Sequence, residues 1–268
     1  MIKAPAKINI GLNIVSKRDD GFHNLETLFY PIYDLYDELI FEDFDQFEFD
    51  SELSFENIIV KAVKLLEKHI KKNIPVKITL KKNIPIGAGL GGGSSDAATV
   101  LKTINEILEL NLSKIELAAI ALELGSDVPF FLKKKPAIGK SRGEKLTEID
   151  LHIDKPILLV NPGIHASTKE AFSQINPSPA EFNYDEIVKI PVQNYRNFIV
   201  NDFEQSVFKM HPEIENIKKN LYSAGAMFAL MSGSGSTVYG IFENINDTKS
   251  ASEQFPEDYF TFISSSLK

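Results

Sequence analysis

Between residues 85 and 95 the chain reads Pro85-Ile86-Gly87-Ala88-Gly89-Leu90-Gly91-Gly92-Gly93-Ser94-Ser95, and Asp96-Ala97-Ala98 follow directly. Five of the seven residues from Gly87 to Gly93 are glycine. Because glycine has no Cβ, such a backbone turns tightly and approaches a ligand closely, and its N–H groups can converge on an anion. We expect a helix behind the loop, capped by Ser94, Ser95 or Asp96. A helix N-terminus adds unpaired N–H groups and the positive end of a dipole, so the segment predicts a phosphate-binding site.

Two other classes of glycine-rich loop fit these residues less well. Gly87, Gly89 and Gly92 satisfy the dinucleotide pattern G-x-G-x-x-G, which is weak by itself. A dinucleotide fold would need a strand after the helix, whereas residues 114–124 have the pattern of a second helix. No Lys-Ser or Lys-Thr pair follows the glycines, which excludes a Walker loop. The hydroxyls of Ser94 and Ser95 could contact phosphate oxygens or a phosphate-bound magnesium ion, while a plain flexible turn is the structural alternative.

The composition excludes several classes of function. With 268 residues, 43% hydrophobic and 25% charged, the chain resembles an ordinary globular protein of one large or two modest domains. Its net charge of −8 argues against a nucleic-acid partner, which needs a clustered basic surface. The absence of cysteine excludes disulfides, thiolate metal sites and cysteine nucleophiles. We see no signal peptide and no membrane-spanning apolar run, and therefore expect a cytoplasmic protein without a membrane partner.

The N-terminal segment alternates with period two, which predicts a strand with one buried face. Lys7 and Asn9 lie together on its other face. A charged, irregular stretch at 140–155 suggests a boundary, and the strands and helices do not alternate regularly. We therefore predict an α+β protein of two domains, residues 1–150 and 151–268, rather than a doubly wound sheet. Strands are predicted at 28–33, 38–42, 46–49, 76–81, 157–160, 227–231, 237–242 and 259–264, and helices at 57–72, 97–110, 114–124, 169–174, 202–210, 213–224 and 247–254.

Two residues outside the loop are candidates for catalysis. Asp127 is the one acid in the segment Gly125-Ser126-Asp127-Val128-Pro129-Phe130-Phe131, and it is either a turn or capping residue or a functional one. Lys7 is either a surface lysine or a functional cation. A kinase needs a group that takes or guides the proton of the acceptor hydroxyl, and cations that balance the charge on the transferring phosphoryl group. An Asp–Lys pair beside a phosphate loop supplies both.

Three segments together resemble the motifs of the GHMP kinases: Pro5-Ala6-Lys7-Ile8-Asn9, the loop 85–95, and Ser232-Gly233-Ser234-Gly235. Taken alone, the last of these is equally well a hairpin turn between two strands. The turn Asp20-Gly21-Phe22-His23 and the segment 125–131 match in the same order, so that the resemblance covers nearly the whole chain. The resemblance implies an N-terminal domain like ribosomal protein S5 domain 2 and a C-terminal ferredoxin-like domain.

The resemblance also implies an activity and a set of site residues. It implies phosphoryl transfer from ATP, with magnesium, to the 2-hydroxyl of a methylerythritol unit linked to cytidine diphosphate, in the non-mevalonate isoprenoid pathway. By position, Asp127 matches the catalytic aspartate and Lys7 the catalytic lysine, and residues 85–95 bind the nucleotide. Asn9 matches a substrate-contacting asparagine, and His23 matches a residue that recognises the edge of cytosine. Phe22 matches a ring that stacks on cytosine, where many members have tyrosine. Phe172 matches the opposing ring, and Thr168 matches a hydroxyl on the substrate side.

Other functions are open at this point. The chain could be a GHMP kinase for another small alcohol, such as mevalonate or homoserine, although those substrates have no base for Phe22 and His23 to bind. A non-catalytic nucleotide-binding protein would keep the loop but need not keep Asp127 and Lys7. A dehydrogenase is a more distant alternative. The sequence predicts a monomer or weak homodimer with small-molecule partners, assigns no residue to metal coordination, and does not identify the residues that bind adenine.

Overall fold

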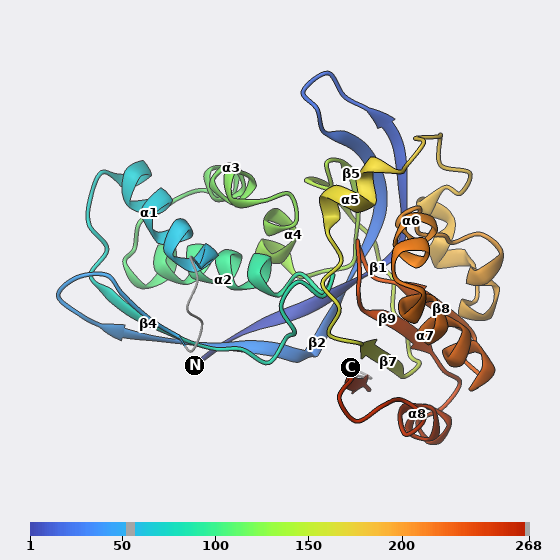
Figure 1. Cartoon of the computed structure of the whole chain (residues 1–268). Helices are drawn as coiled ribbons and strands as arrows, with labels where there is room; N and C mark the ends of the chain where they lie inside the picture. The colour runs from blue at the N-terminus through green and yellow to red at the C-terminus, as the bar shows by residue number, and fades with distance from the viewer. Residues whose placement is uncertain (52–56, 266–268) are drawn as a thin grey trace.

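The computed structural model describes residues 1–51 and 57–265. Their strands form two sheets, one of six strands and one of four, and each sheet carries helices (Figure 1). All strands of the first sheet lie within residues 2–148, and those of the second lie within residues 157–264. Among the described residues, no helix is both long enough and apolar enough to cross a membrane.

The first sheet is built around a long antiparallel hairpin of β1 and β2. Its strand order is β3-β4-β2-β5-β6, with β1 paired to β2. In Figure 1 the helices α1 to α4 lie on one side of β2 and β4, and one buried cluster that includes Val63, Ile78 and Leu101 fills the space between them. The elements are β1 (Ile2–Lys17), β2 (His23–Asp43), β3 (Glu48–Ser51), α1 (Ile58–Ile70), β4 (Val76–Lys81), α2 (Gly92–Ile107), α3 (Lys114–Leu124), α4 (Val128–Lys133), β5 (Ala137–Ser141) and β6 (Lys145–Glu148).

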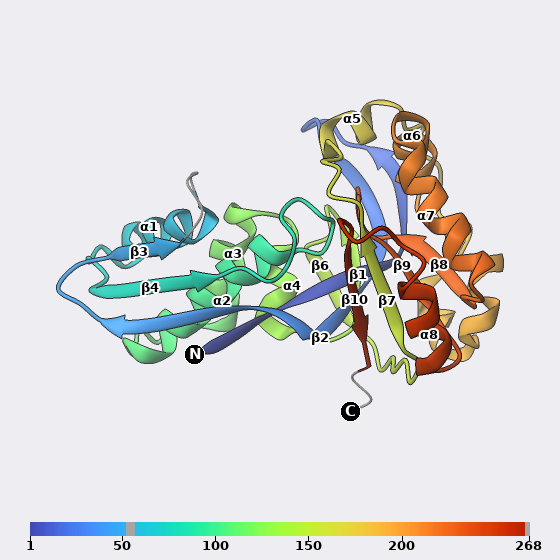
Figure 2. The same cartoon turned by 60° about the horizontal axis from the view of Figure 1, so that its bottom comes forward.

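The second sheet has the order β10-β7-β9-β8, and its neighbouring strands are antiparallel. In chain order this is the arrangement of a ferredoxin-like fold, in which the first and last of four strands pair beside each other. Figure 2 shows α6, α7 and α8 on one face of this sheet. Its elements are β7 (Ile157–Asn161), α5 (Thr168–Ser173), the 3-10 helices Tyr184–Lys189 and Val192–Asn197, α6 (Phe203–Met210), α7 (Pro212–Ser223), β8 (Phe228–Met231), β9 (Val238–Ile241), α8 (Ile245–Ser252) and β10 (Phe260–Ser264). The architecture is thus the predicted α+β fold of two domains.

The two sheets share a buried core. Ile8 and Ile10 of β1 belong to the same hydrophobic cluster as Leu159 of β7 and Tyr239 of β9. The expectation that the N-terminal strand has one buried face is therefore wrong, since every residue from Ala4 to Ile14 is buried. Packing against the second sheet covers one side of the strand and the site described below covers the other. The division at residues 150 and 151 falls between β6 and β7 and stays a prediction.

Local expectations are wrong at two other places. The residue that caps α2 is Gly91, in the left-handed conformation, so Ser94, Ser95 and Asp96 lie inside the helix and do not cap it. The stretch 140–155, expected to be irregular, contains the end of β5 and all of β6, which pair as an antiparallel hairpin. The short helix α4 directly after Asp127 was not predicted either.

Candidate active site

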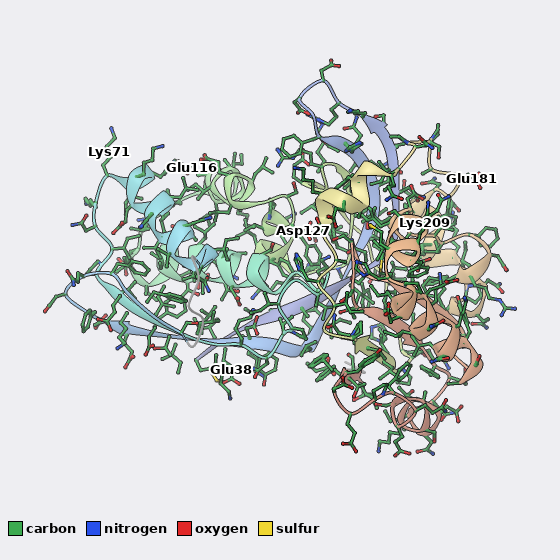
Figure 3. The ribbon with its side chains drawn as sticks, in the orientation of Figure 1. Glu38, Lys71, Glu116, Asp127, Glu181 and Lys209 are labelled. Carbon is green, nitrogen blue, oxygen red and sulfur yellow. The ribbon has the colours of Figure 1, made fainter. Side chains whose placement is uncertain are left out.

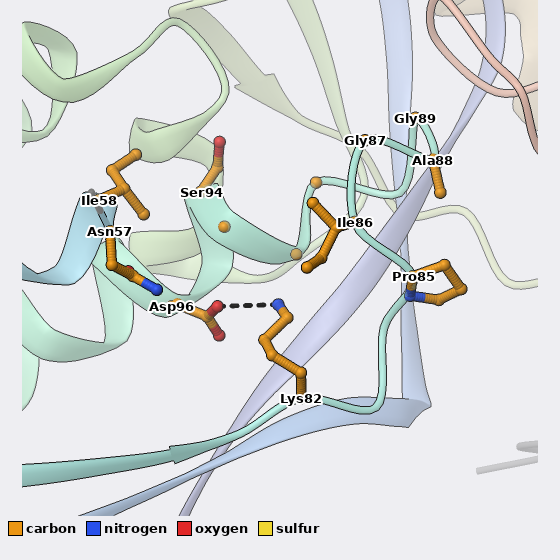
Figure 4. A pocket seen from close by; sticks show the side chains of 13 residues that line it. Asn57, Ile58, Lys82, Pro85, Ile86, Gly87, Ala88, Gly89, Ser94 and Asp96 are labelled. Atoms are coloured by element: carbon orange, nitrogen blue, oxygen red, sulfur yellow. Dashed lines mark hydrogen bonds and ion pairs between the residues drawn. The ribbon is translucent and has the colours of Figure 1, made fainter. Parts of the chain in front are cut away.

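The glycine-rich loop forms one wall of a cavity of about 370 Å³ in front of helix α2 (Figure 4). Gly87, Gly89 and Gly91 have positive φ angles of 66°, 77° and 70°, a region in which only glycine is unstrained. A Cβ on Gly91 would lie 2.8 Å from the Phe131 ring and 3.1 Å from Cε of Lys7. The glycines are thus required by both conformation and space.

Helix α2 presents free N–H groups to this cavity. Its first intrahelical hydrogen bond runs from the Ser95 N–H to the carbonyl oxygen of Gly91, 2.9 Å apart. The N–H groups of Gly92, Gly93 and Ser94 therefore precede the hydrogen-bond ladder of the helix. Unpaired N–H groups and the positive end of the helix dipole favour a bound anion, so the loop and α2 fit a phosphate chain.

The loop rests on the second small-residue turn, which precedes β9. The carbonyl oxygen of Gly89 accepts a hydrogen bond of 2.9 Å from the Ser232 hydroxyl, and the Thr237 N–H donates to the Ala88 carbonyl at 3.2 Å. A Cβ on Gly89 would lie only 2.1 Å from the Ser232 carbonyl oxygen. The two glycine-containing segments, 143 residues apart in sequence, thus form a close backbone contact.

A buried charge cluster, which sequence reasoning missed, lies beneath the loop. Lys82 forms ion pairs with Asp37 and, at 3.0 Å, with Asp96 of α2. Burial raises the pKa of Asp96 to about 7, against the opposing effect of Lys82. Oδ1 of Asp96 is buried without a hydrogen-bond partner. Figure 4 shows Lys82 and Asp96 facing each other at this cavity, and carboxylate oxygens are among the ligands that magnesium prefers.

Lys7 and Asp127 meet next to the loop. Nζ of Lys7 lies 3.4 Å from Oδ2 of Asp127, 2.6 Å from Oδ1 of Asn9 and 3.0 Å from the carbonyl oxygen of Gly89. Burial lowers the pKa of Lys7, and the carboxylate of Asp127 acts in the opposite direction. With a side-chain exposure of 3%, Lys7 is not a surface lysine.

Asp127 occupies the N-cap position of α4, but its side chain makes no capping hydrogen bond. Its side chain is 36% exposed, and it faces Lys7 instead of the helix backbone. Figure 3 places Asp127 in the middle of the molecule, where the helices of the first sheet approach the second half of the chain. The geometry therefore favours the functional interpretation of Asp127 over the capping one.

A second cavity, of about 320 Å³, extends from the Lys7–Asp127 pair to the tip of the β1–β2 hairpin. In Figure 2 this tip lies beside α5, and the stacked rings of His23 and Phe172 join the hairpin to α5. All seven site residues predicted outside the loop line this one cavity, although their roles remain predictions: Lys7, Asn9, Phe22, His23, Asp127, Thr168 and Phe172. Among the residues that the structure describes, no group of three or more His, Cys, Asp or Glu side chains is arranged to hold a metal ion.

The rings at the far end of this cavity contact other side chains. The ring of Phe172 stacks on His23, with centroids 4.8 Å apart and an angle of 14° between the planes. Phe22 is 49% exposed, and the guanidinium of Arg142 lies 3.9 Å from its ring centroid. The hydroxyl of Thr168 is hydrogen-bonded to that of Ser234 at 2.7 Å.

Asn9 is held inside the protein rather than free at the cavity wall. Its amide oxygen accepts the hydrogen bond from Lys7, and its amide nitrogen donates to the Thr27 hydroxyl at 2.9 Å. The most direct contribution of Asn9 in this structure is to orient Lys7.

Comparison with known proteins agrees with this architecture. Residues 57–135 match the model of the GHMP kinases N terminal domain, and residues 182–260 match that of the GHMP kinases C terminal. A protein of Bacteroides fragilis named 4-diphosphocytidyl-2-C-methyl-D-erythritol kinase is 47% identical in an alignment of 253 residues, and the match covers 90% of this chain and 92% of that protein.

Solved structures show the same relationship. A crystal structure of a 4-(cytidine 5'-diphospho)-2C-methyl-D-erythritol kinase superimposes with a TM-score of 0.86 at 31% identity, covering 98% of this chain and 97% of that chain. A homoserine kinase from Cytophaga hutchinsonii, at 16% identity and a TM-score of 0.70 over 98% of this chain and 95% of its own, shares the fold alone. The chain is a kinase that belongs to the GHMP kinases and, within them, to the family of 4-diphosphocytidyl-2-C-methyl-D-erythritol kinases.

Proposed function

We propose that the chain transfers the γ-phosphoryl group of ATP to the 2-hydroxyl of 4-diphosphocytidyl-2-C-methyl-D-erythritol, in the non-mevalonate isoprenoid pathway. The observation that carries the proposal is the position of the Lys7–Asp127 pair, 3.4 Å apart. The pair lines the cavity that ends at Phe22, His23 and Phe172. Lys7 also donates a hydrogen bond to the carbonyl oxygen of Gly89 in the glycine-rich loop. The acceptor hydroxyl and the phosphate chain would thus approach each other across these two side chains.

The nucleotide's phosphates would be held by the loop 85–95 and the N-terminus of α2. The cavity there has free N–H groups, and a Cβ at Gly89 or Gly91 of the loop would clash with neighbouring atoms. Bound magnesium would supply positive charge to the phosphate oxygens during transfer, and Asp96 and Ser94 line the cavity at which it would be held.

Asp127 would accept the proton of the acceptor hydroxyl. Its partly exposed carboxylate makes no capping bond and points at the cavity. Lys7 would hold this carboxylate in place and add a positive charge where negative charge gathers on the transferring group. Because Asn9 and the Gly89 carbonyl direct the ammonium of Lys7, the pair needs little reorganisation before reaction.

The cytidine would lie at the aromatic end. A base stacked on an aromatic ring gains about 1–3 kcal/mol, and Phe22 is exposed enough to provide such a surface. His23 would bind the edge of the base, and the Thr168 hydroxyl, now bonded to Ser234, lies on the same cavity for a polar contact.

Two alternatives predict different behaviour. In a GHMP kinase for mevalonate or homoserine, the substrate would have no base for Phe22, His23 and Phe172 to bind. A non-catalytic nucleotide-binding protein would not need a buried lysine, because burying an ammonium costs free energy that a binding loop alone does not require.

The test is a steady-state assay of ADP release with ATP, magnesium and 4-diphosphocytidyl-2-C-methyl-D-erythritol, with mevalonate and homoserine in parallel reactions. We expect turnover with the first acceptor alone. Asp127→Asn should lower kcat by about 10²- to 10⁴-fold and leave the KM for ATP within about threefold. Asp45→Asn, at an exposed residue between β2 and β3, is the matched control and should behave as wild type.

Turnover with mevalonate or homoserine in place of the cytidylyl substrate would contradict the proposed substrate. A loss of activity in Asp127→Asn that is matched by an equal loss of folding stability would instead assign Asp127 a structural role.

A further inference from the structure

We propose that Arg142 binds the diphosphate of the acceptor substrate, so that the enzyme's affinity for this substrate depends on the diphosphate as well as on the base. This inference rests on the proposed function. Arg142 lies in the turn between β5 and β6 and lines the same cavity as Lys7, Asp127 and Phe172. The sequence did not single it out, because an isolated arginine in a polar turn resembles a surface residue.

The guanidinium of Arg142 is unpaired. No described residue forms an ion pair or a side-chain hydrogen bond with it, and its Nε is buried without a partner. An arginine offers five N–H donors in a planar fork that matches phosphate oxygens. A guanidinium that has no hydrogen-bond or ion-pair partner among the described residues, on a side chain that lines a cavity, is therefore arranged to bind an anion that enters it.

The other cations of this region have partners already. Lys7 is bonded to Asp127, Asn9 and the Gly89 carbonyl. Arg18, on the neighbouring hairpin, donates to both carboxylate oxygens of Asp20 at 2.8–3.1 Å. Asp20 lies close enough to Arg142 for their charges to attract each other, but no ion pair or hydrogen bond joins these two side chains. Arg142 is left as the arginine of this cavity that can exchange water for a phosphate.

The position of Arg142 is held from two sides. The backbone N–H of Arg142 donates a hydrogen bond of 2.8 Å to Oε2 of Glu144, which keeps the tight turn closed. Its guanidinium lies on the ring of Phe22, 3.9 Å from the centroid, and such a cation–π contact keeps the side chain extended toward the hairpin tip. The phosphates that follow a base stacked near Phe22 would come within reach of this fork.

The alternative is that Arg142 only covers the ring of Phe22. The two roles differ in which part of the ligand they affect. If Arg142 binds phosphate, replacing it weakens the binding of cytidine diphosphate and leaves the binding of cytidine unchanged. If Arg142 only packs on Phe22, replacing it weakens the binding of both ligands equally, because the base alone contacts the ring.

Calorimetric titration of the full-length enzyme with cytidine and with cytidine diphosphate separates these roles. For Arg142→Met we expect about ten- to hundredfold weaker binding of cytidine diphosphate and a change of less than about threefold for cytidine. Arg142→Lys, which keeps the charge but lacks the fork, should lie in between. Arg196→Met, at an exposed arginine outside this cavity, is the matched control and should bind both ligands as wild type does.

Unchanged binding of cytidine diphosphate by Arg142→Met, or an equal loss for cytidine, would overturn the inference alone and leave the proposed function standing. Wild-type enzyme that binds neither ligand and phosphorylates another alcohol would overturn the proposed function, and the inference with it. Thermal unfolding of each variant and its KM for ATP, both expected to be unchanged, exclude a folding defect as the cause.

Discussion

Replacing Gly89 with alanine tests whether activity depends on the close backbone contact between the glycine-rich loop and the turn that begins at Ser232, here called the Ser232 turn. The new Cβ would lie 2.1 Å from the carbonyl oxygen of Ser232 and 3.0 Å from that of Gly235. Both neighbours are backbone atoms, which cannot rotate away as a side chain could. The clash is relieved only if one backbone segment moves by roughly 1 Å, since cores and loops packed this closely have no free volume.

The movement would reach Lys7, and with it the proposed catalytic pair, through the Gly89 carbonyl. This oxygen accepts hydrogen bonds from Nζ of Lys7 at 3.0 Å and from the Ser232 hydroxyl at 2.9 Å. A misplacement of about 1 Å in a positioning element can cost about 10²-fold in rate. We therefore expect Gly89→Ala to lower kcat/KM by about 100-fold.

Gly163→Ala is the matched control for this substitution. Gly163 has a similar φ of 73°, but a Cβ there would meet no atom within 4 Å. Both variants therefore carry the same left-handed strain of about 1–2 kcal/mol, which urea denaturation measures, and only Gly89→Ala carries the clash. Steady-state kinetics of the two proteins, side by side, give the comparison. If Gly89→Ala stays within threefold of Gly163→Ala in kcat/KM, the loop does not depend on this contact and the reasoning fails.

Two further predictions concern charge and stacking. The folded protein holds the Asp96 proton more tightly than the unfolded chain does, because the pKa of Asp96 is raised from 3.8 to about 7. Wild-type stability should therefore fall by about 2–3 kcal/mol between pH 5 and pH 8, and Asp96→Asn should remove most of this decline in urea titrations; an unchanged slope would contradict it. Phe22→Ala should raise the KM for the cytidylyl substrate about tenfold or more while kcat and the KM for ATP stay close to wild type, and an equal KM would rule out stacking on this ring.

The tight turns of the glycine-rich loop could be predicted from sequence because their signals are local, whereas the meeting of Lys7 and Asp127 was indicated only by the resemblance to the GHMP kinases. Five glycines within seven residues have few structural explanations, and the structure adds that Gly87, Gly89 and Gly91 adopt positive φ. Strand β4 and helix α3 likewise begin and end at the predicted residues, since their periodicity and caps lie within the segment itself. Ser113, for instance, caps α3 together with Glu116 in a capping box.

The features that could not be predicted depend on partners far along the chain. Asp37, Lys82 and Asp96 form a cluster only after β2, the segment behind β4 and helix α2 have packed together. The burial of β1 on the side of Ile8 and Ile10 likewise results from the second sheet, which begins about 150 residues later. The stacking of Phe172 on His23 joins α5 to the hairpin, and no spacing in the sequence encodes which of two adjacent rings it meets.

The site therefore exists only when both halves of the chain are assembled around Lys7. Its ammonium is buried, which lowers the pKa of Lys7, while the carboxylate of Asp127 acts in the opposite direction. Its three N–H groups have three oxygen partners, which come from β1, from the phosphate loop and from the start of α4, and the Ser232 turn of the second half holds the loop oxygen in place. Loss of any one partner would leave a buried donor unsatisfied, at a cost of about 1–3 kcal/mol. The contacts that join the two halves of the chain thus also position the ammonium of Lys7, so we expect a loosened second half to disturb the pair of Lys7 and Asp127.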